Sequence, residues 1–106
     1  MKKQVVITEQ AEAFADSLDA ASFKRFIAAK TILSETGFLH APLAEKIEGV
    51  NGLFAIRIMT DANARFFYCY DDGTCIYILS GYLKKSSKIP KAEMKHALTI
   101  KKGLGL

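Results

Sequence analysis

The basic residues of this chain gather toward its C-terminus, in the stretch LKKSSKIPKAEMKHALTIKK. From Lys84 onwards there are seven lysines and one acidic residue, Glu93, whereas residues 1–83 hold eight basic and ten acidic side chains. A solvated surface normally mixes charges of both signs, so a cluster of one sign favours an anionic partner over solubility alone. We therefore predict that this end of the protein binds nucleic acid.

Two arginines form the second candidate for chemistry. Arg57 and Arg65 lie in neighbouring segments, LFAIRI and ARFFYCY, whose composition is typical of strands. A loop of residues 60–62 between them would place Arg57 directly opposite Arg65 on an open sheet face. Like charges across a strand pair destabilise a sheet, so this pair of arginines predicts that an anionic ligand binds at this face. The alternative is that each arginine contacts an acid from a loop or reaches into water.

The lysines and one tyrosine near the arginines complete the candidate site. Adjacent ammonium groups disfavour each other's charged form, so either Lys84 or Lys85 could accept a proton, and the alternative is that both only anchor phosphate. Tyr82 could bind phosphate, stack on a base or cap the core, of which the core role is slightly favoured. The other predicted nucleic-acid contacts are all lysines: Lys46, Lys88, Lys91, Lys95 and Lys102. His40 and His96 are interpreted as surface histidines.

The elements that must position these residues follow from the periodicity of the apolar positions. The predicted elements are a strand over 4–8, a helix over 9–19, a second helix ending at Gly37, a loop over 38–52, strands over 53–58, 64–70 and 74–82, and a helix over 90–102. The order β-α-α-β-β-β-α predicts an α+β domain, with a largely antiparallel sheet and helices packed on one face.

The sequence Asp72-Gly73 predicts a two-residue hairpin turn between the last two strands. In that register Arg65 lies opposite Ser80, and Cys69 and Cys75 point to opposite faces of the sheet. We therefore expect no disulfide, which suits a reducing compartment. Two cysteines without a nearby histidine also predict no metal site, and nothing in the sequence indicates a cofactor.

Length and composition predict one domain over residues 1–106. Half of the 106 residues are hydrophobic and a quarter are charged, which is ordinary for a single compact unit. The lysines at positions 2 and 3 are followed by only three apolar residues. We therefore expect neither a signal peptide nor a membrane span, and we expect a cytoplasmic protein.

From GLFAIRI through ARFFYCY to YLKKSSKIPKAEMKHAL, the chain resembles the phage-derived, HigB-like branch of the RelE/ParE toxin superfamily. Members typically show a Gly-Leu-aromatic-Glu-Leu-Arg strand, an Arg-x-Phe-Tyr strand, a His-Gly-Phe/Tyr strand end, a Lys-Lys-Thr/Ser loop and a helix led by proline. The resemblance covers residues 46–102 well and residues 1–38 only in the order of elements. Ala55 replaces the Glu of that pattern, Ser80 replaces its His, and Tyr82 stands where Phe is commoner.

The resemblance implies a RelE-like fold and the toxin of a type II toxin–antitoxin pair. Such a toxin cleaves mRNA on the ribosome without metal, by attack of a 2′-OH that leaves a 2′,3′-cyclic phosphate, and is silenced by an antitoxin that is often a helix-turn-helix protein. The catalytic residues that it implies are Arg57, Arg65, Lys84 and Lys85. Three alternatives stay open: a binder that blocks translation without cutting, a ParE-like gyrase inhibitor, and a structural protein. An antitoxin segment could pair with an exposed strand edge or with the tail at 104–106.

Overall fold

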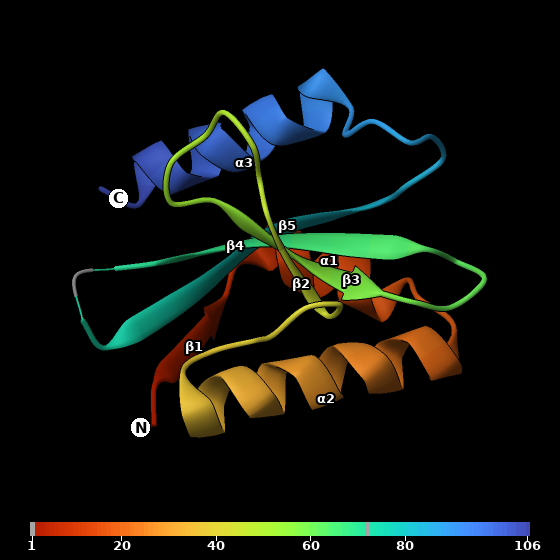
Figure 1. Ribbon diagram of the computed structural model, residues 1–106, viewed down its shortest axis with the longest axis horizontal. Coiled ribbons are helices and arrows are strands. Elements are labelled where there is room, and N and C mark those ends of the chain that lie inside the picture. Colours follow the sequence, from red (N-terminus) through yellow and green to blue (C-terminus); the bar gives the residue numbers. More distant parts are fainter. Residues whose placement is uncertain (1, 72) are drawn as a thin grey trace.

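The structure, a computed structural model that describes residues 2–71 and 73–106, is built on one five-stranded sheet with helices on both faces (Figure 1). The order across the sheet is β1-β5-β4-β3-β2; β1 runs parallel to β5, and the other neighbours are antiparallel. The predicted α+β class with a largely antiparallel sheet is confirmed. The elements are β1 (Gln4–Ile7), α1 (Glu9–Asp16), α2 (Ala20–Thr36), β2 (Ala44–Lys46), β3 (Phe54–Ile58), β4 (Ala64–Tyr70), β5 (Cys75–Leu83) and α3 (Lys91–Gly103).

Capping residues set the bounds of the first two helices. The Thr8 hydroxyl accepts a hydrogen bond from the Ala11 amide at 3.2 Å and begins α1. Asp19 caps α2 in the same way, so α1 cannot continue to residue 19 as predicted and ends at Asp16. Gly37 ends α2 at a φ of 77°, a left-handed conformation that glycine adopts without strain. In the described chain no helix is both long and apolar enough to span a membrane.

The helices do not all pack on one face, as the sequence led us to expect. Helices α1 and α2 bury Phe66, Tyr68 and their neighbours, while α3 lies on the opposite face over Phe67 and Cys69 (Figure 1). The reason lies in β4, whose first six residues are all buried, so both of its faces need a cover. Ala97 of α3 packs against this opposite face, and its side chain is fully buried.

The last hairpin differs from its predicted register. Asp71 closes the turn: its amide donates to the Cys75 carbonyl at 3.0 Å, and its carboxylate accepts from the Cys75 amide at 2.9 Å. The predicted turn residue Asp72 lies outside the described residues. Because the connection is longer than two residues, and the register shifts once more between Phe67 and Tyr68, Arg65 lies opposite Tyr82.

The same shift corrects the predicted placement of the cysteines. Cys69 lies opposite Tyr77, so Cys75, two residues before Tyr77, faces the same side of the sheet as Cys69. Both cysteines are free. Burial raises the pKa of the Cys69 thiol, which keeps it protonated near neutral pH.

Strand β2 was not predicted and occupies part of the expected loop over 38–52. Its three residues, Ala44 to Lys46, have little intrinsic preference for a strand. They become one by pairing with β3, which places Glu45 directly opposite Ala55. β2 is an edge strand and adds a carboxylate beside the arginines.

Gly81 allows α1 to lie close to the sheet. An added Cβ would meet the ring of Phe14 and would lie 3.0 Å from Cδ2 of Phe66, and these two rings already contact each other edge to face. We expect Gly81→Ala to lower the free energy of unfolding by about 1–3 kcal/mol through overpacking. Urea denaturation measures this. Gly103→Ala is the control, because nothing lies within 4 Å of its added Cβ; equal midpoints for the two variants would contradict the prediction.

Candidate functional site

The predicted pair of arginines is present in the sheet. Arg57 lies directly opposite Arg65, as the sequence predicted. The open face that we expected around them is absent at Arg65, which is only 3% exposed, while Arg57 is half-buried and donates to the Pro42 carbonyl at 3.3 Å. The alternative that an arginine contacts an acid from elsewhere therefore holds for Arg65.

Arg65 is held by three groups. Its Nη1 donates to Oδ1 of Asn63 at 2.7 Å and to the Ala64 carbonyl at 3.1 Å. Its Nε lies 3.5 Å from Oε1 of Glu45, too poorly aligned for a hydrogen bond, and both of these buried atoms lack a partner among the described residues. Buried polar atoms without a hydrogen bond are destabilising, so a further group that hydrogen-bonds this pair would be favoured.

Asn63 connects Arg65 to the basic stretch. Its backbone has a φ of 52°, a left-handed conformation that asparagine tolerates. The Asn63 side chain donates to the Lys84 carbonyl at 3.2 Å, and the Lys84 amide donates back to the Asn63 carbonyl at 3.0 Å. The end of β5 is thereby fixed next to Arg65. The turn composition at residues 60–63 could have indicated this asparagine, which sequence reasoning passed over.

Glu45 is the other site residue that sequence reasoning missed. Its side chain is about one-third exposed and pairs with Arg65 across β3, on the face where Ala55 leaves space. No sequence pattern pointed to it, because it lies in a segment that was predicted as loop. The family pattern has a Glu at the position of Ala55, and here Glu45 supplies a carboxylate from the neighbouring strand.

A surface groove of about 360 Å³ has Glu45 in its lining, whereas Arg65 does not line it. It runs between the chain that follows β2 and the connection from β5 to α3. Three of the predicted lysines, from two separate parts of the chain, meet there. The lining residues are Glu45, Lys46, Ile47, Glu48, Lys84, Ser87, Lys88, Ile89 and Met94.

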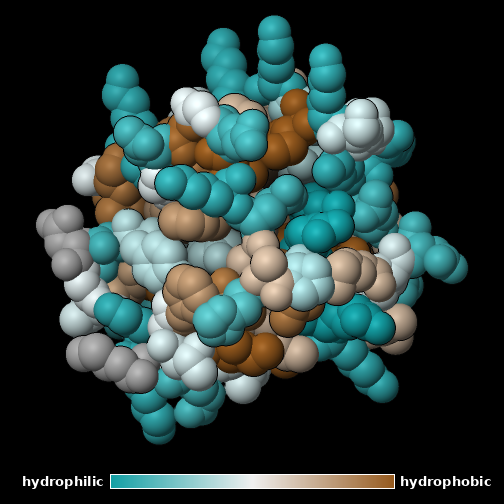
Figure 2. All heavy atoms as spheres, in the orientation of Figure 1, coloured by the Kyte–Doolittle hydropathy of each residue, from teal (hydrophilic) through white to brown (hydrophobic). Residues whose placement is uncertain are grey.

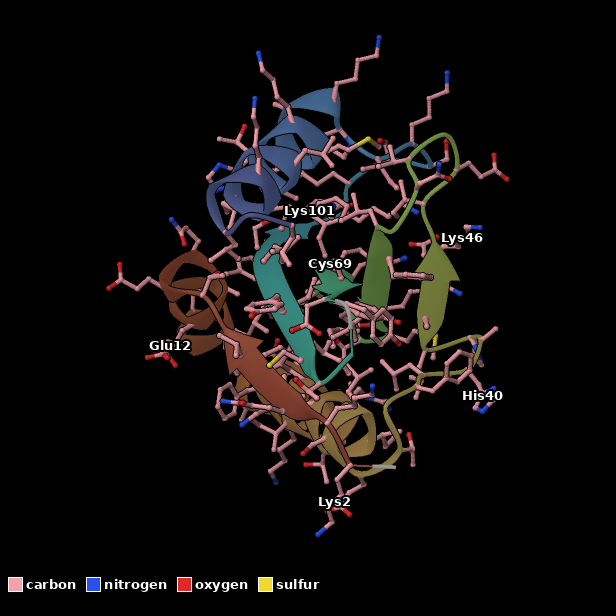
Figure 3. The ribbon with its side chains drawn as sticks, turned by 90° about the vertical axis from the view of Figure 1, so that its left-hand side faces the viewer. Lys2, Glu12, His40, Lys46, Cys69 and Lys101 are labelled. Atoms are coloured by element: carbon pink, nitrogen blue, oxygen red, sulfur yellow. The ribbon has the colours of Figure 1, made fainter. Side chains whose placement is uncertain are left out.

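The remaining predicted lysines lie outside this groove. Lys85 is exposed and does not line it, although Lys84 beside it does. The three lysines of α3 are exposed: Lys91, Lys95 and Lys102. Hydrophilic side chains project from the surface over α3 (Figure 2), and nitrogen-tipped side chains extend from this helix away from the sheet, whereas Lys46 lies on the edge strand (Figure 3). The predicted basic cluster is thus a groove plus a separate helix surface.

Tyr82 belongs to the core. Its side chain is 4% exposed and its ring stacks on that of Phe67 at 5.4 Å, which leaves little ring surface for a nucleic-acid base. Burial raises the pKa of Tyr82, although the nearby Arg65 charge opposes this. Ser80 is also buried and lies opposite Phe67, so the predicted pairing of Arg65 with Ser80 is wrong.

Both histidines are exposed and neither lines the groove. His40 packs edge to face against Phe38 at 4.5 Å, on the connection between α2 and β2. Among the described residues, no three His, Cys, Asp or Glu side chains lie close enough together to hold a metal ion.

One protein family matches the chain over most of its length. The model of the family described as "Phage derived protein Gp49-like" matches residues 13–102. No curated protein matches the chain.

Solved structures of toxins share the fold. The archaeal RelE–RelB complex from Pyrococcus horikoshii matches with a TM-score of 0.64 at 24% identity, over 82% of this chain and all of the other. A mutant of the E. coli toxin RelE in the free state matches with a TM-score of 0.66 at 16% identity, over the whole of both chains. In the heterotetrameric YoeB–YefM toxin–antitoxin complex from Staphylococcus aureus, the match has a TM-score of 0.56 at 21% identity, over 81% of this chain and 99% of the other.

Proposed function

The chain belongs to the phage-derived Gp49-like family, and from that premise we propose that it is the toxin of a type II toxin–antitoxin pair and cleaves mRNA on the ribosome. Its fold is that of the RelE and YoeB toxins. The observation that carries the proposal is the groove in which Lys46, Lys84 and Lys88 meet beside Glu45, the ion-pair partner of Arg65. A cluster of lysines of this kind suits the phosphates of a single RNA strand.

The proposed reaction needs no group from outside the chain and its RNA. The 2′-OH of one nucleotide loses its proton and attacks the adjacent phosphorus, and the bond from phosphorus to the 5′ oxygen of the next nucleotide breaks. The products are a 2′,3′-cyclic phosphate and a 5′-OH that has gained a proton. The guanidinium group of arginine does not act as a base in proteins, so Arg57 and Arg65 can stabilise the phosphorane but cannot accept the proton.

Lys84 and Glu45 are the proton acceptors that the groove offers. Lys84 lines it, whereas Lys85 does not, so we assign Lys85 to phosphate anchoring only. Glu45 also lines the groove, and its side chain is about one-third exposed although Oε1 is buried against Arg65. Glu45→Gln keeps the shape of the side chain and removes its basicity, so loss of cleavage in this variant with retained cleavage in Lys84→Arg would identify the carboxylate as the base.

Lys84→Ala is expected to lower mRNA cleavage about a hundredfold, because removal of one charge-stabilising group typically costs that much. Primer extension on mRNA from translating ribosomes measures the cleavage. Lys24→Ala is the matched control: Lys24 is exposed on α2, away from the groove, and its loss should leave cleavage unchanged. Equal cleavage by both variants would overturn the role of the groove.

A second candidate function is a binder that blocks translation without cutting. The burial of Arg65 against Glu45 favours it, because the guanidinium must leave or share this carboxylate before it reaches a phosphate. Intact mRNA together with halted translation would support this reading. Inhibition of DNA supercoiling by gyrase, with no effect on translation, would instead indicate the ParE-like alternative.

The proposed partner is an antitoxin that neutralises the toxin. Two of the fold relatives were solved with such partners, RelB and YefM. A helix-turn-helix antitoxin, as the sequence resemblance implies, remains part of this proposal.

A further inference from the structure

A second hollow, of about 400 Å³, lies on the other side of β2 from the basic groove. It is bounded by the connection that follows α2, by the edge strand β2 and by the aromatic side chains of β3 and β4. Its lining is mostly apolar, unlike that of the groove. The residues that carry the argument are Phe38, Phe54, Tyr68, Tyr70, Lys3 and Lys46.

Aromatic rings form the wall of this hollow. Phe54 stacks on Tyr68 at 5.5 Å and meets Tyr70 edge to face at 5.6 Å. Tyr68 is 1% exposed, whereas Phe38 at the rim is 52% exposed, more than any other large hydrophobic side chain of the described chain. A concave apolar site beside an exposed aromatic ring is typical of a surface that receives one large apolar side chain.

The edge of β2 next to the hollow offers backbone hydrogen bonds. The Arg57 amide donates to the Leu43 carbonyl, and the Ile47 amide donates to the Leu53 carbonyl. The backbone groups of residues 43 and 47 therefore point toward β3. In an antiparallel pair the alternate residues, Ala44 and Lys46, then direct their backbone groups away from β3. The Ala44 amide donates to the His40 carbonyl at 3.1 Å, which leaves the backbone of Lys46 at the open edge.

The charges around the hollow select an acidic occupant. Lys3 and Lys46 line it, with Glu45 as the only acid among the lining residues. The Lys3 ammonium donates to the Gly73 carbonyl and is thereby held near β5. A segment that places acidic residues next to a large apolar one would match both the apolar wall and the two lysines.

We propose that this hollow and the edge of β2 form the docking site for an extended segment of the antitoxin. The segment adds a strand to β2, inserts one large apolar side chain between Phe38 and Phe54, and places acidic side chains beside Lys3 and Lys46. This inference rests on the proposed toxin function. Since Glu45 and Lys46 line both the hollow and the basic groove, a segment bound at β2 also lies next to the groove.

Phe38→Asp tests the docking site against Phe23→Asp as the matched control. Both rings are exposed, at 52% and 37%, and Phe23 lies near the opposite end of α2 from the hollow. The probe is the purified product of the gene that adjoins the gene of this chain, titrated by calorimetry. We expect Phe38→Asp to raise the Kd at least tenfold and Phe23→Asp to leave it within about twofold. Hydrogen exchange should show new protection of the Lys46 amide in the wild-type complex.

Growth arrest on expression without the probe protein separates the two proposals. Arrest by wild type and by Phe38→Asp, with neutralisation by the probe lost only in Phe38→Asp, supports the docking site. Arrest by all three proteins, with equal neutralisation and no protection at Lys46, overturns the docking site and leaves the toxin function standing. Absence of both arrest and a complex with the wild-type protein overturns the toxin function and the docking site together.

Discussion

Arg65→Ala is expected to lower mRNA cleavage by a factor of about a thousand and the free energy of unfolding by about 2 kcal/mol. The loss of cleavage follows from the loss of a fixed cation where charge builds on the phosphorane. The loss of stability follows because Glu45 and Asn63 lose their buried partner. This loss of stability is smaller than the loss expected for a fully buried ion pair, because water reaches the Glu45 side chain, which is 34% exposed.

The double variant Glu45→Ala with Arg65→Ala separates the two effects. Removing both partners eliminates the unpaired carboxylate, so urea denaturation should show part of the stability restored. Cleavage should stay as low as in Arg65→Ala, because no cation has returned. Recovery of cleavage along with stability would mean that Arg65 acts only in folding, and the proposed role in the reaction would be wrong.

The sheet could be predicted to the extent that single strands carry their own pattern. The composition of ARFFYCY and of LFAIRI predicted β4 and β3, and the loop between them predicted that Arg57 lies opposite Arg65. Strand β2 carries no such pattern, because its three residues become a strand only through pairing with β3. The register of β5 depended on the length of the turn that Asp71 closes and on a bulge. The sequence indicated a turn but not its length, and it gave no signal of the bulge.

The sequence predicted the basic residues of the site but not the residues that contact them. Counting charges found Lys84, Lys88 and Arg65, since positive charge is visible one residue at a time. Glu45 joins them only because the fold brings β2 beside β3, a contact that sequence spacing does not reveal. The helical periodicity of α3 was predicted correctly, but it does not indicate which face of the sheet the helix covers.

Ala97→Asp is expected to detach α3 from the sheet and to remove cleavage together with it. Ala97 is fully buried between α3 and the face that carries Phe67 and Cys69. A carboxylate placed there has no partner and costs about 3 kcal/mol or more. Met94 of the same helix lines the groove, so the groove should lose one wall when the helix leaves.

His96→Asp provides the matched control for this change, because it introduces the same charge one residue earlier at an exposed position. Hydrogen exchange should show loss of protection across α3 in Ala97→Asp only, while the amides of α1 and α2, which pack on the other face, stay protected. Unchanged protection of α3 in Ala97→Asp would contradict the predicted detachment. Full cleavage by a protein whose α3 is detached would show that the reaction needs only the sheet, the arginines and the end of β5.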